Sequence, residues 1–240
     1  TFEGYFKRII IAGDGGEALQ LVRSHVPDII VSDVMMPRMN GYKLCKTIKE
    51  DINISHIPVI LLTARDDRQS QISGYKNGAD GYLSKPFEVE MLMELIRNRL
   101  KNREYTKKRY LNAGLIPTPE ESTISLTDET FLIKLNSIIQ ENIENSNLGI
   151  QFICQEVGLG RSSLYNKLKA LTGMGANEYI SKLRIEKAIT LISGTDMPFS
   201  EIAEKTGFTT PSYFSTAFKQ YTGETPSQYK ERKKKGLAGK

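Results

Sequence analysis

The chain has 240 residues, which is more than one ordinary domain needs and enough for two. Hydrophobic residues make up 39% and charged residues 25% of it, a composition that excludes collagen-like, low-complexity and wholly disordered proteins. No apolar run approaches the roughly 18 residues of a membrane span, and we expect no signal peptide. Because the chain does not begin with Met, we expect that Thr1 is not the natural start.

Cysteine, histidine and charge restrict the chemistry further. Cys45 and Cys154 lie far apart in apolar helical patterns, so we expect both to be buried and reduced rather than part of a disulfide framework. His25 and His56 have no partners at zinc-ligand spacing. The net charge is +5, and five of the six residues from Lys230 to Lys235 are basic, a distribution that suits nucleic acid.

The first hundred residues alternate between short apolar runs and amphipathic stretches, which is typical of a parallel sheet with helices on both faces. Runs that are apolar at every position fit strands buried from both sides. The expected strands are Arg8–Ala12, Asp28–Asp33, Pro58–Thr63 and Gly81–Ser84, and the expected helices are Gly16–Val26, Tyr42–Glu50, Arg68–Gly78 and Glu88–Lys108. The sequence therefore predicts an α/β doubly wound domain.

From residue 105 to 127 the periodicity fails, and Pro117 and Pro119 favour a linker. Beyond Asp128, which can cap a helix, nothing resembles a strand and helical patterns recur to the end. The expected organisation is an α/β domain over residues 1–104, a linker over 105–127, an all-α domain of about seven helices over 128–235 and a tail over 236–240.

The second half contains an internal repeat. Residues 162–173, SSLYNKLKALTG, match residues 212–223, SYFSTAFKQYTG, at an offset of 50. Apolar side chains at i, i+4 and i+7 are expected to face the core in both copies, namely Leu164, Leu168 and Leu171, and Phe214, Phe218 and Tyr221. Each copy consists of a short helix, a turn with glycine and a second helix, the pattern of a helix-turn-helix.

Three polar side chains are expected to converge at the carboxyl edge of the sheet. Asp33 and Thr63 each end a strand, and Lys85-Pro86 follows another. Ligands of such folds bind in the crevice beyond the carboxyl ends of the strands. A carboxylate, a hydroxyl and an ammonium around one point can bind a phosphoryl group whose charge the lysine and a metal ion neutralise.

These residues resemble the response-regulator receiver domain, with its motifs SDVMMPRMNGYKLC, PVILLTA and GADGYLSKPF in the family's order. The resemblance implies a flavodoxin-like fold in which Asp33 accepts a phosphoryl group from a kinase phosphohistidine. It implies that Thr63 hydrogen-bonds that group, that Lys85 pairs with it, and that Tyr82 is an aromatic switch. It also implies a cis bond before Pro86.

The resemblance also implies a Mg²⁺ ion bound by Asp33 and the backbone carbonyl of Met35. Receivers hold this ion with an acidic pair that follows a first strand, and only seven residues precede Arg8–Ala12. We therefore expect a truncated receiver that lacks its first strand and binds Mg²⁺ weakly or not at all. Glu3 or Asp14 could substitute for the pair, but neither ends a suitable strand.

The outward faces of the second helices in the two repeats carry candidate DNA contacts. Arg and Asn side chains suit guanine and adenine edges, whereas Ser, Thr and Tyr suit phosphates or single bases. The candidates are Arg161, Ser162, Tyr165, Asn166 and Lys169 in the first copy, and Ser212, Tyr213, Thr216 and Lys219 in the second. Residues 128 to 235 resemble the AraC-type DNA-binding domain, with Ala176–Ile192 as the helix that joins its two units.

Together the two resemblances imply a transcription regulator that binds double-stranded DNA, with a histidine kinase as partner and a homodimer as the activated state. The order of domains is similar to the C-terminal end of hybrid two-component regulators, which by analogy suggests carbohydrate-use genes, a cytoplasmic location and no direct membrane contact. Two alternatives stay open: regulation by protein contact without phosphorylation, and an aspartyl-phosphate phosphatase. The phosphatase would need a second Asp at position 35, where Met35 stands, so we expect no enzyme.

Overall fold

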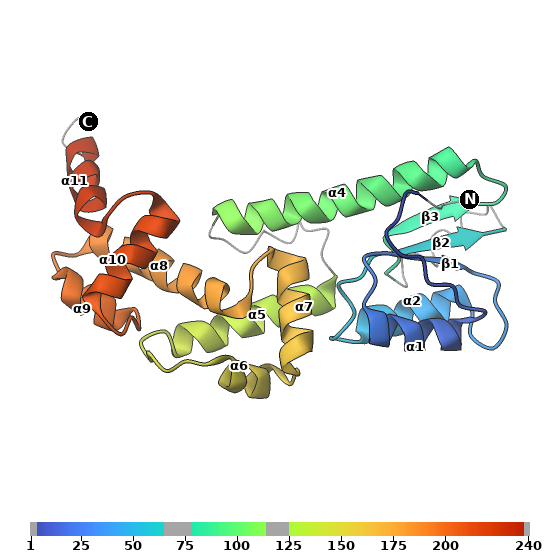
Figure 1. Cartoon of the computed structure of the whole chain (residues 1–240), viewed down its shortest axis with the longest axis horizontal. Coiled ribbons are helices and arrows are strands. Elements are labelled where there is room, and N and C mark those ends of the chain that lie inside the picture. Colours follow the sequence, from blue (N-terminus) through green and yellow to red (C-terminus); the bar gives the residue numbers. More distant parts are fainter. Residues whose placement is uncertain (1–3, 65–77, 114–124, 238–240) are drawn as a thin grey trace. The chain divides into compact units, whose positions relative to one another are not determined.

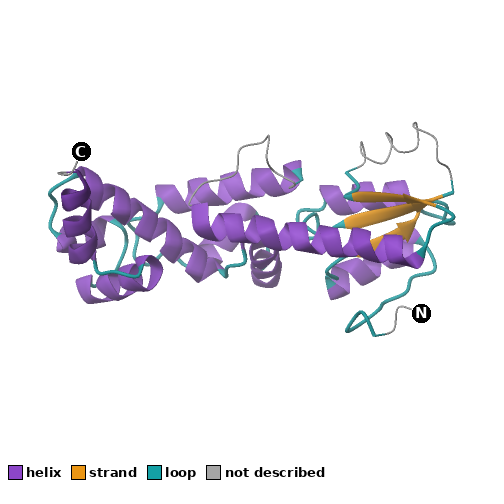
Figure 2. Cartoon of the chain, turned by 90° about the horizontal axis from the view of Figure 1, so that it is seen from above, coloured by secondary structure: helices purple, strands orange, loops and turns teal. Residues whose placement is uncertain are grey.

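The computed structural model describes residues 4–64, 78–113 and 125–237. The chain divides into two compact units, Thr1–Arg109 with Pro117–Phe131 and Tyr110–Ile116 with Leu132–Lys240. The first unit contains the sheet shown in Figure 1. The described part of the second unit contains helices and loops without a strand (Figure 2).

Three parallel strands form the sheet, in the order β1 (Ile30–Asp33), β2 (Val59–Thr63) and β3 (Gly81–Ser84). Ile30 lies opposite Val59, and Ile60 lies opposite Gly81. The central strand β2 is buried at four of its five positions, as its continuous apolar sequence predicts for a strand covered on both faces.

Helices cover both faces of this sheet. Helices α1 (Gly15–His25) and α2 (Gly41–Glu50) lie on one face, and α4 (Val89–Ala113) lies on the other (Figure 1). Leu92, Met93 and Ile96 of α4 pack against the sheet in a cluster of their own. The predicted α/β fold with helices on both faces is therefore confirmed.

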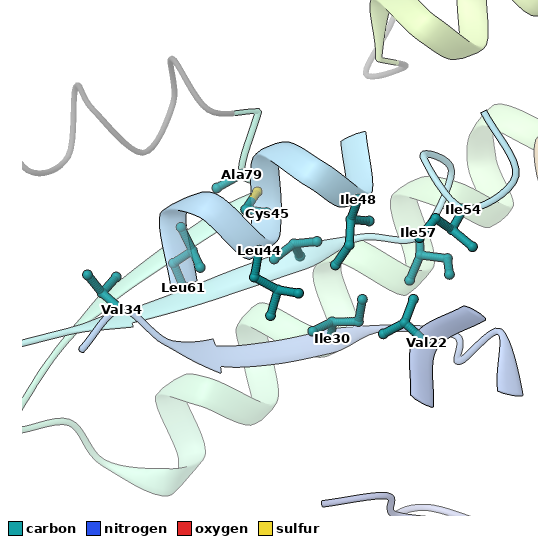
Figure 3. Packing of buried hydrophobic residues seen from close by; sticks show 11 residues of the cluster. Val22, Ile30, Val34, Leu44, Cys45, Ile48, Ile54, Ile57, Leu61 and Ala79 are labelled. Atoms are coloured by element: carbon teal, nitrogen blue, oxygen red, sulfur yellow. The ribbon is translucent and has the colours of Figure 1, made fainter. Parts of the chain in front are cut away.

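The core beneath α1 and α2 is a continuous apolar cluster (Figure 3). Leu44, Cys45 and Ile48 of α2 are fully buried there against Leu61 of β2. Burial raises the pKa of the Cys45 thiol to about 12, so the side chain acts as a small apolar group. No disulfide joins the two cysteines, but Cys154 is only half-buried, so the expectation of full burial is wrong for it.

The predicted strand Arg8–Ala12 is wrong. These residues form no strand, and the side chains of Ile9 and Ile11 are 50% and 83% exposed. No strand in the described part of the chain pairs with this segment, although β1 pairs with β2 alone and has an open edge. Without a paired strand the segment gains no ladder hydrogen bonds, so its apolar pattern does not become a strand.

Two other predicted segments have different outcomes. The helix expected at 68–78 lies almost wholly in residues 65–77, outside the described residues. Helix α4 continues to Ala113, so the first nine residues of the expected linker, 105–113, are helical.

The helices that follow confirm the all-α prediction for the second half. They are α5 (Leu126–Glu141), α6 (Ile150–Val157), α7 (Arg161–Thr172), α8 (Ala176–Gly194), α9 (Phe199–Lys205), α10 (Pro211–Thr222) and α11 (Pro226–Leu237). Helix α8 corresponds to the expected joining helix. None of the helices in the described part of the chain is both long and apolar enough to cross a membrane.

The internal repeat appears as two helix pairs, α6–α7 and α9–α10. Helices α7 and α10 both have 12 residues, and each ends at a glycine in the left-handed conformation, Gly173 or Gly223. Leu164 and Phe214 occupy equivalent positions and are both fully buried. The predicted burial of Tyr221 is wrong: its side chain is 41% exposed. Its hydroxyl donates to Glu186 at 3.2 Å, which keeps the polar end out of the core.

Two equivalent turn glycines offer a matched test of this packing. Gly158 and Gly207 have φ angles of 73° and 70°. A Cβ at Gly158 would meet nothing within 4 Å, whereas one at Gly207 would lie 2.2 Å from the carbonyl oxygen of Ile143. The two positions therefore share a left-handed backbone conformation, but only Gly207 lacks room for a Cβ atom.

We predict that Gly207→Ala destabilises the helical unit more than Gly158→Ala. Alanine in the left-handed conformation costs about 1–2 kcal/mol at either site. The backbone clash at Gly207 should add roughly 1–3 kcal/mol, the usual cost of overpacking. Urea unfolding followed by circular dichroism measures both variants; equal losses of unfolding free energy would contradict the predicted clash.

Candidate functional site

The carboxyl ends of the three strands meet at one edge of the sheet. Asp33 ends β1 opposite Leu62, and Thr63 ends β2 opposite Ser84. The backbone N–H of Lys85 donates to the carbonyl of Thr63 at 2.7 Å. Parallel register thus brings the predicted carboxylate, hydroxyl and ammonium residues to the same edge.

Asp33 is an ion-paired carboxylate with access to solvent. Its side chain is 34% exposed, it forms an ion pair with Lys85, and it accepts a hydrogen bond from the backbone N–H of Met35 at 3.0 Å. Partial burial opposes ionisation, but the Lys85 ammonium and the N–H groups of Met35 and Val34 outweigh it and lower the pKa of Asp33 below its ordinary value. The carboxylate is therefore ionised at neutral pH.

The other predicted residues of this edge differ in burial. Thr63 is buried at the end of β2, with 4% of its surface exposed. Tyr82 is half-buried in β3, on the face covered by α2. The Lys85–Pro86 peptide bond is cis, as the resemblance implied. The side chain of Lys85 contacts Asp33 through the ion pair described above.

The loop after Asp33 contains positions that the sequence analysis did not single out. A Cβ on Gly41 would lie 2.3 Å from the carbonyl oxygen of Asp33, so only glycine permits this approach. Asn40 caps α2 by accepting from the backbone N–H of Lys43 at 2.9 Å. Arg38 has a φ of 61°. The Asn-Gly pair before a helical pattern was the signal for this helix start.

The described residues do not by themselves provide a full magnesium site. Asp33 and the exposed Met35 could supply a carboxylate and a backbone carbonyl, but no group of three His, Cys, Asp or Glu side chains in the described ranges could hold a metal ion. Asp14 is buried, caps α1 through the N–H groups of Gly16 and Glu17, and forms an ion pair with Arg38. It therefore does not stand in for the acidic pair.

The first helix-turn-helix presents a polar outer face on α7. Leu164 and Leu168 anchor the helix in the core. All of its predicted DNA contacts are exposed, namely Arg161, Ser162, Tyr165, Asn166 and Lys169. Their chemistry includes both bidentate hydrogen-bonding groups and a cation for phosphate.

The second helix-turn-helix presents α10 in the same way. Its predicted contacts are also exposed, namely Ser212, Tyr213, Thr216 and Lys219. Thr210 caps the helix by accepting from the backbone N–H of Tyr213 at 3.2 Å. The ring of Tyr213 packs edge-on against the buried ring of Phe208, with centroids 5.8 Å apart. This contact fixes the position of the exposed tyrosine.

Both halves of the chain match known protein families. Residues 3–97 match the response regulator receiver domain, and residues 153–232 match a helix-turn-helix domain. Both matches are consistent with the Asp33 edge and with the paired helices α6–α7 and α9–α10. These are the domains of a regulator rather than of a metabolic enzyme.

Two curated relatives and one solved structure illustrate the similarity. "Histidine kinase P4" of Formosa agariphila is 42% identical over 93% of this chain, which spans only 16% of that protein. "Probable transcriptional regulator ycf29" of Pyropia yezoensis is 30% identical over 71% of this chain and 82% of its own length. The C-terminal domain of AraT, a response regulator from Geobacillus stearothermophilus, is 31% identical over 42% of this chain and 84% of its own, with a TM-score of 0.40.

The sheet edge around Asp33 and the two exposed helices of the repeat agree with the two family matches. The chain belongs to the response regulators, with a receiver domain followed by an AraC-type helix-turn-helix DNA-binding domain.

Proposed function

We propose that this chain is a sequence-specific transcription regulator controlled by phosphorylation of Asp33. The observation that carries the proposal is the state of that side chain: it is ionised, open to solvent and paired with Lys85 at the carboxyl edge of the sheet. An ionised carboxylate is the nucleophile for phosphoryl transfer, and the adjacent ammonium can neutralise the negative charge that arrives.

The transfer requires one bond exchange. A carboxylate oxygen of Asp33 attacks the phosphorus of a phosphohistidine, the P–N bond breaks, and the released imidazole nitrogen takes a proton from solvent. Lys85 keeps its positive charge and shifts from the carboxylate to the phosphoryl oxygens. The hydroxyl of Thr63, at the end of the neighbouring strand, donates a hydrogen bond to the new group.

The phosphoryl group then changes a conformational equilibrium. Movement of Thr63 and Tyr82 toward the site favours one state of the receiver, and that state favours homodimers on adjacent DNA sites. Each DNA-binding domain can bind weakly, because tethering a second copy raises its effective concentration. Helices α7 and α10 enter successive major grooves about one helical turn apart.

The partners follow from the same reading. The phosphoryl donor is a histidine kinase, and the 42% identical relative, itself called a histidine kinase, supports a donor on the same polypeptide. We place the receiver at residues 1–104, the linker at 105–127, the DNA-binding domain at 128–235 and the tail at 236–240.

A cytoplasmic location follows from DNA as partner, and control of carbohydrate-use genes rests on the resemblance alone.

Asp33→Asn should abolish phosphorylation and leave basal DNA binding intact, because the amide is no nucleophile. Labelling with radioactive acetyl phosphate, with and without hydroxylamine, detects the acyl phosphate. Lys85 and the neighbouring backbone N–H groups lower the pKa of Asp33 below its ordinary value, so Asp33 stays ionised and its own titration should not reduce labelling as the pH falls from about 7 to 5. Asp51→Asn is the matched control, because Asp51 also has a lowered pKa and an arginine partner. Equal labelling of Asp33→Asn and the wild type would refute the assignment.

Calorimetric titration with Mg²⁺ should give weak heats without saturation. The reason is that Asp33 lacks a second acidic ligand among the described residues, while Asp14 is held by Arg38. The Asp33→Asn variant is the blank for binding at this site. A tight, saturable isotherm that Asp33→Asn removes would contradict the predicted weakness.

Arg161→Ala should weaken binding to the operator by roughly 1–3 kcal/mol if the guanidinium reads a base. The loss should be far smaller on scrambled DNA. Fluorescence anisotropy with both fragments at fixed salt measures it, because affinity without the salt concentration has no meaning. Arg97→Ala is the control, since Arg97 is an exposed arginine of α4 that pairs with Glu94. An equal loss on both fragments would assign Arg161 to phosphate instead.

A further inference from the structure

Arg184 lies near the middle of α8, the helix that joins the two helix-turn-helix pairs, and its side chain is half-buried. Its Nη2 atom donates a hydrogen bond to the backbone carbonyl of Asn145 at 2.7 Å. Asn145 belongs to the loop 142–149, which leads from α5 into α6. The bond therefore connects α8 to the entrance of the first pair, α6–α7.

The same guanidinium lies against the turn of the second pair, α9–α10. A Cβ on Gly207 would lie 2.8 Å from Nη2 and 2.9 Å from Nε of Arg184. The Cζ atom of Arg184 is 6.0 Å from the centroid of the Phe208 ring, within the range of a cation–π contact. One side chain thus contacts segments of both pairs.

The position of this guanidinium is constrained rather than chosen for its own solvation. Arginine side chains ordinarily keep their charged end in water. The Nε atom of Arg184 is instead buried and has no hydrogen-bond partner among the residues that the structure describes. Because an unpaired buried donor is unfavourable, the contacts with Asn145 and Phe208 must hold the side chain in place.

Phe208 extends this contact to α10, the helix expected to face DNA. Its ring is buried and packs edge-on against Tyr213, one of the predicted DNA contacts. It also packs against Phe214, the fully buried residue that anchors α10. A shift of Phe208 would therefore displace Tyr213 and the start of α10.

We propose that Arg184 is the positioning residue that fixes the second helix-turn-helix relative to the first. It holds the Gly207 turn, and through Phe208 the Tyr213 side chain, against the loop that enters the first pair. This inference rests on the proposed function, in which α7 and α10 enter successive major grooves. Two linked DNA-contacting helices bind best when their separation is fixed before binding. Arg184 thus sets the spacing between the two halves of the DNA site that the domain accepts.

Lys187 offers a matched control on the same helix. It forms an ion pair with Glu144 at 3.3 Å, so it also connects α8 to the loop 142–149. Solvent-accessible ion pairs of this kind contribute little to stability. Arg184→Gln and Lys187→Gln remove the same charge from α8, so a general loss of attraction to DNA would affect both variants equally.

The local step is tested without DNA. In the full chain with ¹³C-labelled tyrosines, the NMR signals of Tyr213, assigned by their loss in Tyr213→Phe, should shift and broaden in Arg184→Gln. Lys187→Gln should leave them unchanged. Arg184→Lys keeps the charge but lacks the planar fork, so it should give a smaller change and replaces Arg184→Gln if that variant does not fold. Tyr213 signals that match the wild type in both Arg184 variants would overturn the proposal.

The effect on spacing is tested with DNA. The probe is a duplex selected from random sequences by the wild-type chain, compared with the same duplex carrying one additional base pair between its two halves. In fluorescence anisotropy at fixed salt, the insertion should weaken binding of the wild type and of Lys187→Gln about tenfold, because their helices keep one separation. Arg184→Gln should bind the original duplex about tenfold more weakly and lose less than about threefold on insertion. An equal insertion penalty in Arg184→Gln and the wild type would mean that Arg184 does not set the spacing.

These outcomes separate the inference from the proposed function. If the wild type selects no sequence, sequence-specific binding fails, and the Tyr213 signals still decide whether Arg184 holds this turn. If the wild type selects a site that Arg184→Gln binds with the same affinity and the same insertion penalty, sequence-specific binding stands and the positioning role fails.

Discussion

The parallel, in-register pairing of β1, β2 and β3 is the constraint on which the first unit depends. Parallel strands end at the same edge, so the residues that follow their apolar runs, Asp33, Thr63 and Lys85, meet although they are distant in sequence. Packing of β2 on both faces restricts the register, because a slip by one residue would exchange Val59 and Leu61 with Ile60 and Leu62 between two differently shaped apolar clusters. The packing of the strands therefore sets the positions of Asp33 and Thr63, which are their last residues, and of Lys85, which directly follows β3.

One edge of β1 has no paired strand in the described part of the sheet. In the described part of the sheet β1 pairs with β2 only. Its residue Val31 is 39% exposed, and Ile9 and Ile11 are more exposed still. A strongly β-prone sequence does not form a strand without a partner for its backbone groups. The Asp33 carboxylate at the end of β1 is paired with Lys85, which follows β3 at the same edge of the sheet.

The duplicated helix pairs meet one packing requirement with two different cores. Leucines fill the first, whereas aromatic rings fill the second, where Phe214 contacts Phe208 and Phe218 with centroids 5.4 and 5.7 Å apart. Edge-to-face and tilted contacts of this kind add about 0.5–1.5 kcal/mol each beyond the area they bury. The outer faces differ as well, since Arg161 and Asn166 on α7 have no equivalents of the same chemistry on α10. The two copies therefore keep the same architecture while presenting different chemistry to a partner.

Periodicity and spacing alone determined the two-part architecture, three of the four strands, the repeat and the residues around Asp33. These features depend on local apolar patterns and on short motifs, which do not depend on contacts between distant parts of the chain. Only the tertiary structure decided that Arg8–Ala12 is no strand, that Tyr221 turns outward to Glu186, and that Tyr42 meets Tyr82. Each of these outcomes depends on a partner distant in sequence, or on the lack of one in the described chain. A pattern states what a segment prefers, whereas the neighbours available in the fold decide whether that preference is met.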